Sequence, residues 1–521
     1  MGVYLNPDNE KFYESINSEI YVDKSGLIKY LNKVVHTSQK YVCVSRPRRF
    51  GKSMTADMIA AYYSRGCDSR EIFEQLELGS DINFVKYLNK YNVIQINMQE
   101  FLSRSKNIDD MIGLLQKKII WELLEEYSDV RYFDKTDLIE SIQNIYQSTR
   151  IPFVIIIDEW DCIFREYKCN RESQERYLDF LRDMLKDKSY IHLAYMTGIL
   201  PIKKYGTHSA LNMFSEFSMT NPGQLAEFVG FTQSEVDSIC ERYNMDVQEM
   251  KKWYDGYCFK NVGEVYNPKS VVEAALSGIY DDYWNRTETY EALKIYIDMN
   301  FDGLRDDILK MMAGEETIVN VGSFANDMTT FSRKDDVITL LIHLGYLGYH
   351  FETKRAFIPN NEIMLEYADS VAMSDWGEVS NALSMSQKTL EAIWNRQEDK
   401  VAEFIANAHV ETSHLQYNDE NALSYTISIA LYVARNYYTV IREMPTGNGF
   451  ADIVYLPRKQ YMDKPALVVE LKWNKSAKGA IDQIKEKKYM AGLEEYMENI
   501  LLVGINYDKR TRKHTCEIQN A

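Results

Sequence analysis

Short apolar runs alternate with longer amphipathic stretches through the first 230 residues. Four runs are rich in valine and isoleucine or similar apolar residues and have the length of strands: residues 41–45, 93–97, 153–157 and 191–195. Sequences with helical periodicity lie between them, as in residues 108–127. Because buried strands that alternate with helices build a parallel sheet with crossover helices, this pattern predicts an α/β domain.

The pattern changes after this region. Residues 334–349 place apolar positions at helical spacing, and residues 349–358 then have the form of a hairpin around Thr353. A helix followed by two strands indicates a winged-helix element. From Val401 we predict a helix through Tyr437, then two strands, then a lysine-rich helix.

Charge is distributed unevenly along the 521 residues. The formal net charge is −17 with 45% hydrophobic residues; by segment it is −3 for residues 1–230, −14 for 231–400 and 0 for 401–521. The apolar content excludes a mostly disordered chain, and the acidity argues against a protein that coats nucleic acid non-specifically. The acidic middle segment favours a structural role for the winged-helix element over DNA binding.

The cellular setting follows from what the sequence lacks. Its N-terminal residues show no basic region followed by an apolar run, so we expect no signal peptide. The longest notable uncharged stretch, residues 421–434, has 14 residues, too few to span a bilayer. The seven cysteines include no C-x-x-C pair and predict neither a disulfide framework nor a zinc module. We expect a cytoplasmic protein with no membrane partner.

A candidate phosphate-binding loop follows the first strand. It leads into a helical stretch, residues 54–63, so that backbone N–H groups at the helix N-terminus would face phosphates. Lys52 would contact the β- and γ-phosphates, and Ser53 would ligate Mg²⁺. Arg46 stands where the motif usually has its first glycine. The alternative that the motif is a chance match in a surface loop therefore stays open. The candidate nucleotide-binding residues here are Arg46, Pro47, Arg48, Arg49, Phe50, Gly51, Lys52, Ser53 and Met54.

Two carboxylates end the strand at residues 153–157. In a parallel sheet they would lie beside the candidate loop, with Asp158 holding Mg²⁺ and Glu159 polarising the attacking water. Strands often end in polar residues, but the order and distance after Gly-Lys-Ser support this site. The next strand ends at Thr197-Gly198, where Thr197 is a candidate γ-phosphate sensor or, equally, a turn residue.

Six short motifs occur in order along the chain: Tyr21-Val-Asp-Lys24, Arg46-Pro-Arg-Arg-Phe-Gly-Lys-Ser53, Ile157-Asp-Glu-Trp-Asp161, Thr197-Gly198, Trp253-Tyr-Asp-Gly-Tyr257 and Tyr266-Asn-Pro268. Together they resemble prokaryotic AAA-ATPase-like proteins that carry a C-terminal PD-(D/E)XK nuclease-superfamily domain. The resemblance implies that arginine at position 46 is normal for this group. It also implies that Asp23 and Lys24 lie near the nucleotide. We expect the aromatic block at Trp253 to pack in the interior, with a lid or interdomain role as the alternative.

A second acidic group lies in residues 401–521. Asp452 begins a strand after a glycine turn, and Glu470 and Lys472, at positions i and i+2 of the next strand, share a face. Asp452 and Glu470 together would form an oxygen site for Mg²⁺ or Mn²⁺. Lys472 would orient or deprotonate the water that attacks a phosphodiester. Glu420 in the preceding helix and Gln483 in the following helix are candidates to complete the site.

This Asp…Glu-x-Lys arrangement resembles the PD-(D/E)XK nuclease core. Elsewhere, Glu-x-Lys on a strand is commonly a solvated face or a cross-strand ion pair. From Arg435 to Met490 the net charge is +5, and Lys485, Lys487 and Lys488 share the helix of Gln483. A basic rim around an acidic centre suits a polyanionic substrate, although an ordinary solvated helix face stays the alternative.

We therefore predict an α/β multidomain protein. Residues 1–230 would form an AAA-like P-loop ATPase domain with a parallel sheet, residues 231–400 an acidic helical and winged-helix connector, and residues 401–521 an α/β PD-(D/E)XK nuclease-like domain. The chain would use ATP with Mg²⁺, with Mn²⁺ an alternative at the nuclease site, and cleave DNA or RNA under ATP regulation.

Two other functions stay open. One is a nucleotide-driven switch or assembly scaffold whose nuclease-like domain binds but does not cut. A small-molecule kinase is the weaker alternative, because it leaves the C-terminal residues without a role. The sequence leaves open DNA versus RNA, endo- versus exonuclease action and homo-oligomerisation, and offers Arg165 and Arg182 only as guesses for a trans-acting arginine.

Overall fold

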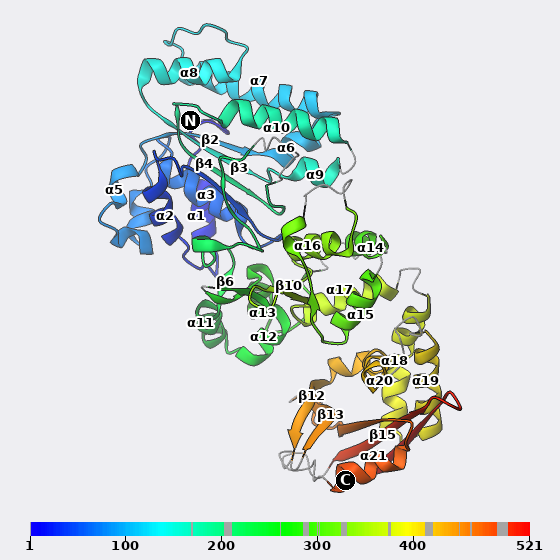
Figure 1. The fold of residues 1–521 in the computed structure, drawn as a ribbon. Helices are drawn as coiled ribbons and strands as arrows, with labels where there is room; N and C mark the ends of the chain where they lie inside the picture. Colours follow the sequence, from blue (N-terminus) through cyan, green and yellow to red (C-terminus); the bar gives the residue numbers. More distant parts are fainter. Residues whose placement is uncertain are drawn as a thin grey trace. The chain divides into compact units, whose positions relative to one another are not determined.

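Two compact units make up the chain (Figure 1). The computed structural model describes residues 2–167, 170–202, 211–260, 262–284, 291–299, 301, 303–324, 331–372, 377–411, 420–446, 449–458, 461–486 and 499–521. The first unit contains Met1–Arg286 and Thr317–Ile363, and the second contains Thr287–Glu316 and Met364–Ala521. Residues 231–400 contribute to both units, and the three-domain division stays a prediction.

A five-stranded parallel sheet organises the first unit. Its order is β2-β3-β4-β1-β5, formed by β1 (Tyr41–Ser45), β2 (Asn92–Asn97), β3 (Phe153–Asp158), β4 (Ile191–Gly198) and β5 (Ser215–Phe217). All residues of β1 and β3 are buried, as expected for strands covered on both faces. The four predicted strands are confirmed. The short β5 was not predicted, because its Ser-Glu-Phe sequence forms no apolar run.

Helices cover both faces of this sheet (Figure 1). On one side α7 (Ile108–Glu126) packs against α8 (Leu138–Thr149) and α10 (Arg171–Leu185). On the other, α3 (Lys52–Tyr63) contacts β3 and β4. The shorter helices of this part are α1 (Glu10–Ile16), α2 (Gly26–Val34), α4 (Arg70–Glu74), α5 (Phe84–Tyr87), α6 (Met98–Ser103) and α9 (Cys162–Glu166). The carboxyl ends of β1, β3 and β4 meet at one edge, where the candidate loop lies.

A smaller mixed region completes the first unit. Strands β6 (Phe231–Thr232), β8 (Gly263–Tyr266) and β7 (Tyr257–Phe259) pair in that order, and α11 (Gln233–Tyr243), α12 (Val247–Tyr254) and α13 (Pro268–Ser277) pack around a common apolar core. The predicted helix and hairpin are confirmed as α16 (Lys334–Leu344), β10 (Gly348–His350) and β11 (Arg355–Phe357), and β9 (Thr317–Ile318) adds a third strand.

The second unit has a mixed five-stranded sheet of order β12-β13-β14-β15-β16. These strands are β12 (Tyr438–Thr446), β13 (Gly449–Pro457), β14 (Ala466–Trp473), β15 (Ile500–Asp508) and β16 (Lys513–Asn520), and only β14 and β15 run parallel. The helices are α14 (Glu291–Ile297), α15 (Leu304–Met312), α18 (Gly377–Trp394), α19 (Glu398–Glu411), α20 (Glu420–Ala430) and α21 (Ala477–Glu486); α17 (Asn361–Ala372) begins in the first unit.

One element prediction in this unit was wrong. The helix expected through Tyr437 ends at Ala430, and a 3₁₀ turn leads into β12. As an edge strand β12 carries Arg442 and a proline, so it shows no apolar run that would have marked it as a strand. The α/β multidomain class itself is confirmed. Among the described helices, none combines the length and apolar content needed to cross a membrane.

Candidate functional site

The loop of residues 46–51 joins β1 to α3 at the sheet edge. Gly51 is the residue before the helix, with φ 88°, and Arg49 has φ 66°. Both lie in the left-handed region, which a glycine adopts without strain. A Cβ at Gly51 would meet no atom within 4 Å, so the loop backbone borders open space there. The N-terminal N–H groups of α3 are thus presented next to a space that an anion can fill.

A cavity of about 620 Å³ opens at this loop. Seven of the candidate nucleotide-binding residues line it together with Glu159: Arg48, Arg49, Phe50, Gly51, Lys52, Ser53 and Met54. Its remaining wall is largely apolar and comes from distant segments that include Phe12, Tyr21, Phe228 and Phe231. A cavity lined by both a helix N-terminus and aromatic side chains suits a molecule with phosphates and a flat base.

Lys52 lies inside the loop rather than in solvent. Its Nζ donates to the carbonyl oxygen of Pro47 at 2.9 Å, and its side chain is buried. Burial lowers the pKa of Lys52, while the neighbouring carboxylates of Glu159 and Asp158 act in the opposite direction. The ammonium group is therefore held at the loop, where a bound phosphate would satisfy the charge that burial disfavours.

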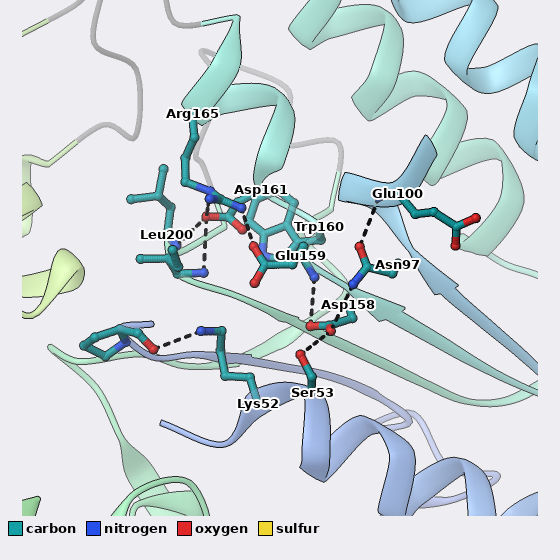
Figure 2. Close-up of polar contacts among 12 residues, drawn as sticks. Lys52, Ser53, Asn97, Glu100, Asp158, Glu159, Trp160, Asp161, Arg165 and Leu200 are labelled. Carbon is teal, nitrogen blue, oxygen red and sulfur yellow. Dashed lines mark hydrogen bonds and ion pairs between the residues drawn. The ribbon is translucent and has the colours of Figure 1, made fainter. Parts of the chain in front are cut away.

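Ser53 lines the cavity and contacts Asp158 at the end of β3 (Figure 2). Ser53 Oγ donates to Asp158 Oδ2 at 2.7 Å, and the backbone N–H of Glu159 donates to Asp158 Oδ1 at 2.9 Å. Burial raises the pKa of Asp158 to about 6, against the lowering effect of the Ser53 hydrogen bond. A hydroxyl and a carboxylate oxygen in contact are donors that Mg²⁺ prefers, so these two residues fit such an ion.

Glu159 follows β3 with φ 53° and lines the cavity. Its carboxylate forms an ion pair with Arg165 of α9, which also approaches Asp161 at 3.4 Å (Figure 2). The Arg165 side chain is only 12% exposed, and both of these carboxylates belong to its own chain; a role as a trans-acting arginine stays a guess. Arg182 is 40% exposed and pairs with Asp179 and Asp183 of its own region.

Thr197 lies within β4 and is fully buried. It is a strand residue and not a turn residue; its carbonyl accepts from the N–H of Trp160 at 3.1 Å. The residue is not part of the cavity wall. Its role as a sensor stays a prediction.

Arg46 and Pro47 are not among the residues that line the cavity, so their contact with nucleotide stays a prediction. The Arg46 guanidinium donates to the carbonyls of Ser45 at 2.9 Å and Phe217 at 3.0 Å and lies over the Phe259 ring. Burial lowers its pKa to about 10. The arginine in place of glycine is tolerated because its side chain packs beneath the loop, where it cannot obstruct phosphates.

Of the pair Asp23 and Lys24, which the resemblance places near the nucleotide, Lys24 is among the residues that line the cavity and Asp23 is not. Lys24 lines the cavity, and its Nζ contacts Glu235 and the Glu227 carbonyl, each at 2.7 Å. Asp23 instead accepts from the backbone N–H groups of Ser25 and Glu77 and so fixes the chain locally. Sequence reasoning missed Glu235, although the capping box that starts at Thr232 could have marked it.

The predicted acidic group of the second unit forms on adjacent strands. Asp452 on β13 accepts from the N–H of Leu471 on β14 at 2.7 Å, and Lys472 Nζ contacts Glu470 Oε1 at 2.7 Å. Gln483 of α21 also donates to that Glu470 oxygen. Glu470 and Lys472 are 1% and 6% exposed, which excludes a solvated strand face. The structure therefore brings all four of these predicted residues together.

The structure describes the other residues predicted for this site only in part. The side chain of Glu420 and the whole of Lys487 and Lys488 lie outside the described residues. Lys485 contacts Gln519 at 2.6 Å. Within the described ranges, no group of three or more His, Cys, Asp or Glu side chains could hold a metal. Asp452 and Glu470 nevertheless offer carboxylate oxygens that fit part of a Mg²⁺ or Mn²⁺ site.

Two protein-family models match the chain. Residues 10–207 match a family described as predicted AAA-ATPases, and residues 420–517 match the PD-(D/E)XK nuclease superfamily. The first match contains the 46–51 loop with Asp158 and Glu159. The second contains Asp452, Glu470 and Lys472. Each family match therefore includes one of the two groups of residues described above.

Individual relatives are more distant. An uncharacterized protein in the vnfD 5' region of Azotobacter chroococcum mcd 1 is 24% identical over 277 residues, covering 52% of this chain; the match spans about half, 51%, of the relative. Among solved structures, the ORC2 protein of Aeropyrum pernix has a TM-score of 0.30 at 12% identity, covering 70% of this chain and 98% of its own. Cdc6p of Pyrobaculum aerophilum has a TM-score of 0.25 at 9% identity, covering 71% and 99%.

Proposed function

From the matches of residues 10–207 to predicted AAA-ATPases and of residues 420–517 to the PD-(D/E)XK nuclease superfamily, we propose that the chain hydrolyses ATP and uses it to regulate metal-dependent phosphodiester cleavage. The substrate would be DNA or RNA. We further propose a cytoplasmic setting and leave homo-oligomerisation to experiment.

The observation that carries the ATPase half is the contact of Ser53 with Asp158 beside Lys52. In this function the loop N–H groups and Lys52 bind the β- and γ-phosphates, and the aromatic wall takes the base. Ser53 and Asp158 would hold Mg²⁺, which supplies charge neutralisation on the phosphates. Glu159 lines the same cavity; it would accept a hydrogen bond from the attacking water and take its proton as the P–O bond to ADP breaks.

The nuclease half rests on the buried group around Glu470. Asp452 and Glu470 would hold Mg²⁺ or Mn²⁺, whose chemistry is to stabilise charge on the phosphodiester and acidify a bound water. Lys472 sits within 2.7 Å of Glu470 and orients or deprotonates that water. Gln483 fixes the Glu470 carboxylate from α21, and Glu420 is the proposed additional ligand.

Replacement of Lys52 tests the ATPase half. Lys52→Ala should abolish Mg²⁺-dependent ATP turnover, measured as phosphate release, because it removes the cation at the phosphate loop. Lys29→Ala is the matched control: Lys29 pairs with Glu77 on the surface and does not line the cavity. Turnover that persists in Lys52→Ala would contradict the assignment, and so would a wild-type chain without ATP turnover.

A nucleotide-driven switch or scaffold is the second candidate. It is favoured because the described residues of the second unit include no group of three or more His, Cys, Asp or Glu side chains that could hold a metal. Calorimetric titration of Mn²⁺ into the wild type and into Glu470→Ala separates the two functions. Binding that Glu470→Ala loses supports a nuclease, whereas a wild type that takes up no metal supports a domain that only binds nucleic acid or a partner.

A further inference from the structure

Glu159 is held in place by the chain itself. Its backbone lies in the left-handed region, φ 53°, immediately after β3, and this turns the residue out of the line of the strand toward the cavity. A glutamate side chain has three rotatable bonds, and fixing it in one direction is opposed by conformational entropy. The contact that fixes it is the ion pair with Arg165 (Figure 2).

Arg165 is itself anchored on its other side. Its Nε lies 3.4 Å from Asp161 Oδ2. Asp161 is fully buried and accepts from the backbone N–H groups of Ile199, at 3.2 Å, and Leu200, at 2.9 Å, just beyond β4. Asp161 is thus held by the backbone at the end of β4, and its ion pair limits the movement of the Arg165 guanidinium. Because Arg165 also pairs with Glu159, it limits the movement of the Glu159 carboxylate as well.

The electrostatic setting keeps this arrangement charged. Burial by itself would lower the pKa of Arg165, but Asp161 and Glu159 together raise it above its ordinary value. A planar guanidinium presents its N–H groups at fixed positions and here hydrogen-bonds to Glu159 while facing Asp161 as an ion pair; a lysine ammonium is a point charge on a flexible stem and fixes its partners less well. Arg165 therefore joins two acidic side chains that would otherwise repel each other.

We infer that Arg165 is a positioning residue for ATP hydrolysis, which aims the Glu159 carboxylate into the cavity by bridging it to Asp161. This inference rests on the proposed ATPase function. Arg165 acts through Glu159 and not on the phosphates, because both of its contacts are carboxylates of its own chain. The neutralisation of the phosphates belongs to Lys52 and Mg²⁺.

Comparison of four proteins tests this inference: the wild type, Arg165→Gln, Glu159→Gln and the double variant. Single-turnover ATP hydrolysis gives the rate, and calorimetry gives the Kd of Mg·ATP. Since misplacing a reacting group by 1 Å can slow a reaction about 100-fold, Arg165→Gln should lower the rate about 10- to 100-fold. The Kd should change by less than about threefold, because Arg165 does not line the cavity.

The double variant decides the mechanism. Arg165→Gln should cause no further loss when added to Glu159→Gln, because the group that it positions is already inactive. An equal proportional loss in both backgrounds would overturn the inference and assign Arg165 a direct effect on the phosphates. An unchanged rate in Arg165→Gln would overturn it as well.

Two further variants control for folding. Arg165→Lys keeps the charge and should recover part of the rate; a Lys variant as slow as the Gln variant despite a wild-type melting temperature would contradict positioning by charge. Arg182→Gln removes an exposed arginine of α10 and should match the wild type. A wild type that binds but never hydrolyses ATP would remove the proposed function and this inference together, whereas equal losses in both backgrounds remove the inference alone.

Discussion

Asp158 illustrates the conflict between stability and function at a single residue. Its carboxylate is 4% exposed, and burial raises its pKa to about 6 from an ordinary value of 3.8. Ser53 and Lys52 offset only part of this penalty. Because the folded chain binds this proton more tightly than the unfolded chain, stability falls as the pH rises from 3.8 through 6. Above that window the full penalty applies, about 3 kcal/mol as an upper limit at about 1.4 kcal/mol per pKa unit.

Asp158→Asn should therefore raise the melting temperature at pH 8 without nucleotide or metal. The amide can keep the hydrogen bonds to Ser53 and to the Glu159 N–H, while the buried charge disappears. Thermal unfolding at pH 8 and pH 5 measures the effect, and the gain should be smaller at pH 5, where the wild-type carboxyl is largely protonated. A variant that is less stable than the wild type at pH 8 would contradict this account. The same substitution should abolish Mg²⁺-dependent ATP turnover.

Sequence spacing predicted some residue contacts and not others. The approach of Ser53 to Asp158 followed from two strand ends that meet at one sheet edge, which topology alone determines. The direction of Arg46 could not be predicted, because it depends on the Phe217 carbonyl and the Phe259 ring, far away in the sequence. The ion pair of Glu159 with Arg165 could not be predicted either, because it depends on the left-handed backbone conformation of Glu159.

At the scale of elements, the 46–51 loop is supported from behind by later parts of the first unit. The Arg49 guanidinium donates to the Tyr283 carbonyl at 2.7 Å, and the Phe50 ring packs edge-on against Tyr257. Gly345, which ends α16, packs against Pro47. The aromatic block at Trp253 thus contributes packing to the loop through Tyr257, as expected from the sequence.

Gly345→Ala should weaken ATP binding without touching the cavity. Gly345 has φ 89°, and an added Cβ would lie 2.7 Å from the Pro47 Cβ, so the loop must shift. Gly278→Ala is the matched control, because Gly278 ends α13 with φ 69° and has no atom within 4 Å of the new Cβ.

Both variants carry the strain of a left-handed alanine, roughly 1–2 kcal/mol; in denaturant titrations Gly278→Ala should lose about that much unfolding free energy, and Gly345→Ala should lose more because of its contact with Pro47. Only Gly345→Ala should also raise the Kd of Mg·ATP, by about tenfold if the loop shift costs about 1.4 kcal/mol of binding. Equal Kd values for the two variants would show that the loop does not depend on α16.

Elements differed in how well the sequence predicted them. Strands β1 to β4 and β14 were predicted because they are buried on both faces and show continuous apolar runs. The edge strands β12 and β16 carry several charged and polar residues and show no continuous apolar run. Their strand character comes from hydrogen bonding to a neighbour, which no local pattern reveals.

At the scale of the whole molecule, the net charge of −17 misrepresents its parts. The excess of acidic residues belongs to residues 231–400, while residues 401–521 are neutral. The division into two units was not predicted, because the chain passes between them more than once: Thr287–Glu316 belongs to the second unit and Thr317–Ile363 to the first. A change of composition along the sequence cannot reveal that the chain enters the second unit and then comes back to the first. The charge of residues 401–521 therefore does not oppose a nucleic-acid substrate for that part of the second unit, whereas its other segments, 287–316 and 364–400, are acidic.

The most direct test of the central claim is cleavage of labelled single- and double-stranded DNA and RNA, with Mg²⁺, in the presence and absence of ATP. The wild type should cut at least one substrate at a rate that ATP changes. Lys52→Ala should cut at one rate regardless of ATP, and Asp452→Ala should not cut while still hydrolysing ATP; Asp463→Ala, which removes an exposed carboxylate of the same unit, should behave as wild type. Cleavage by purified Asp452→Ala at the wild-type rate, or a wild-type rate that ATP leaves unchanged, would contradict an ATP-regulated nuclease.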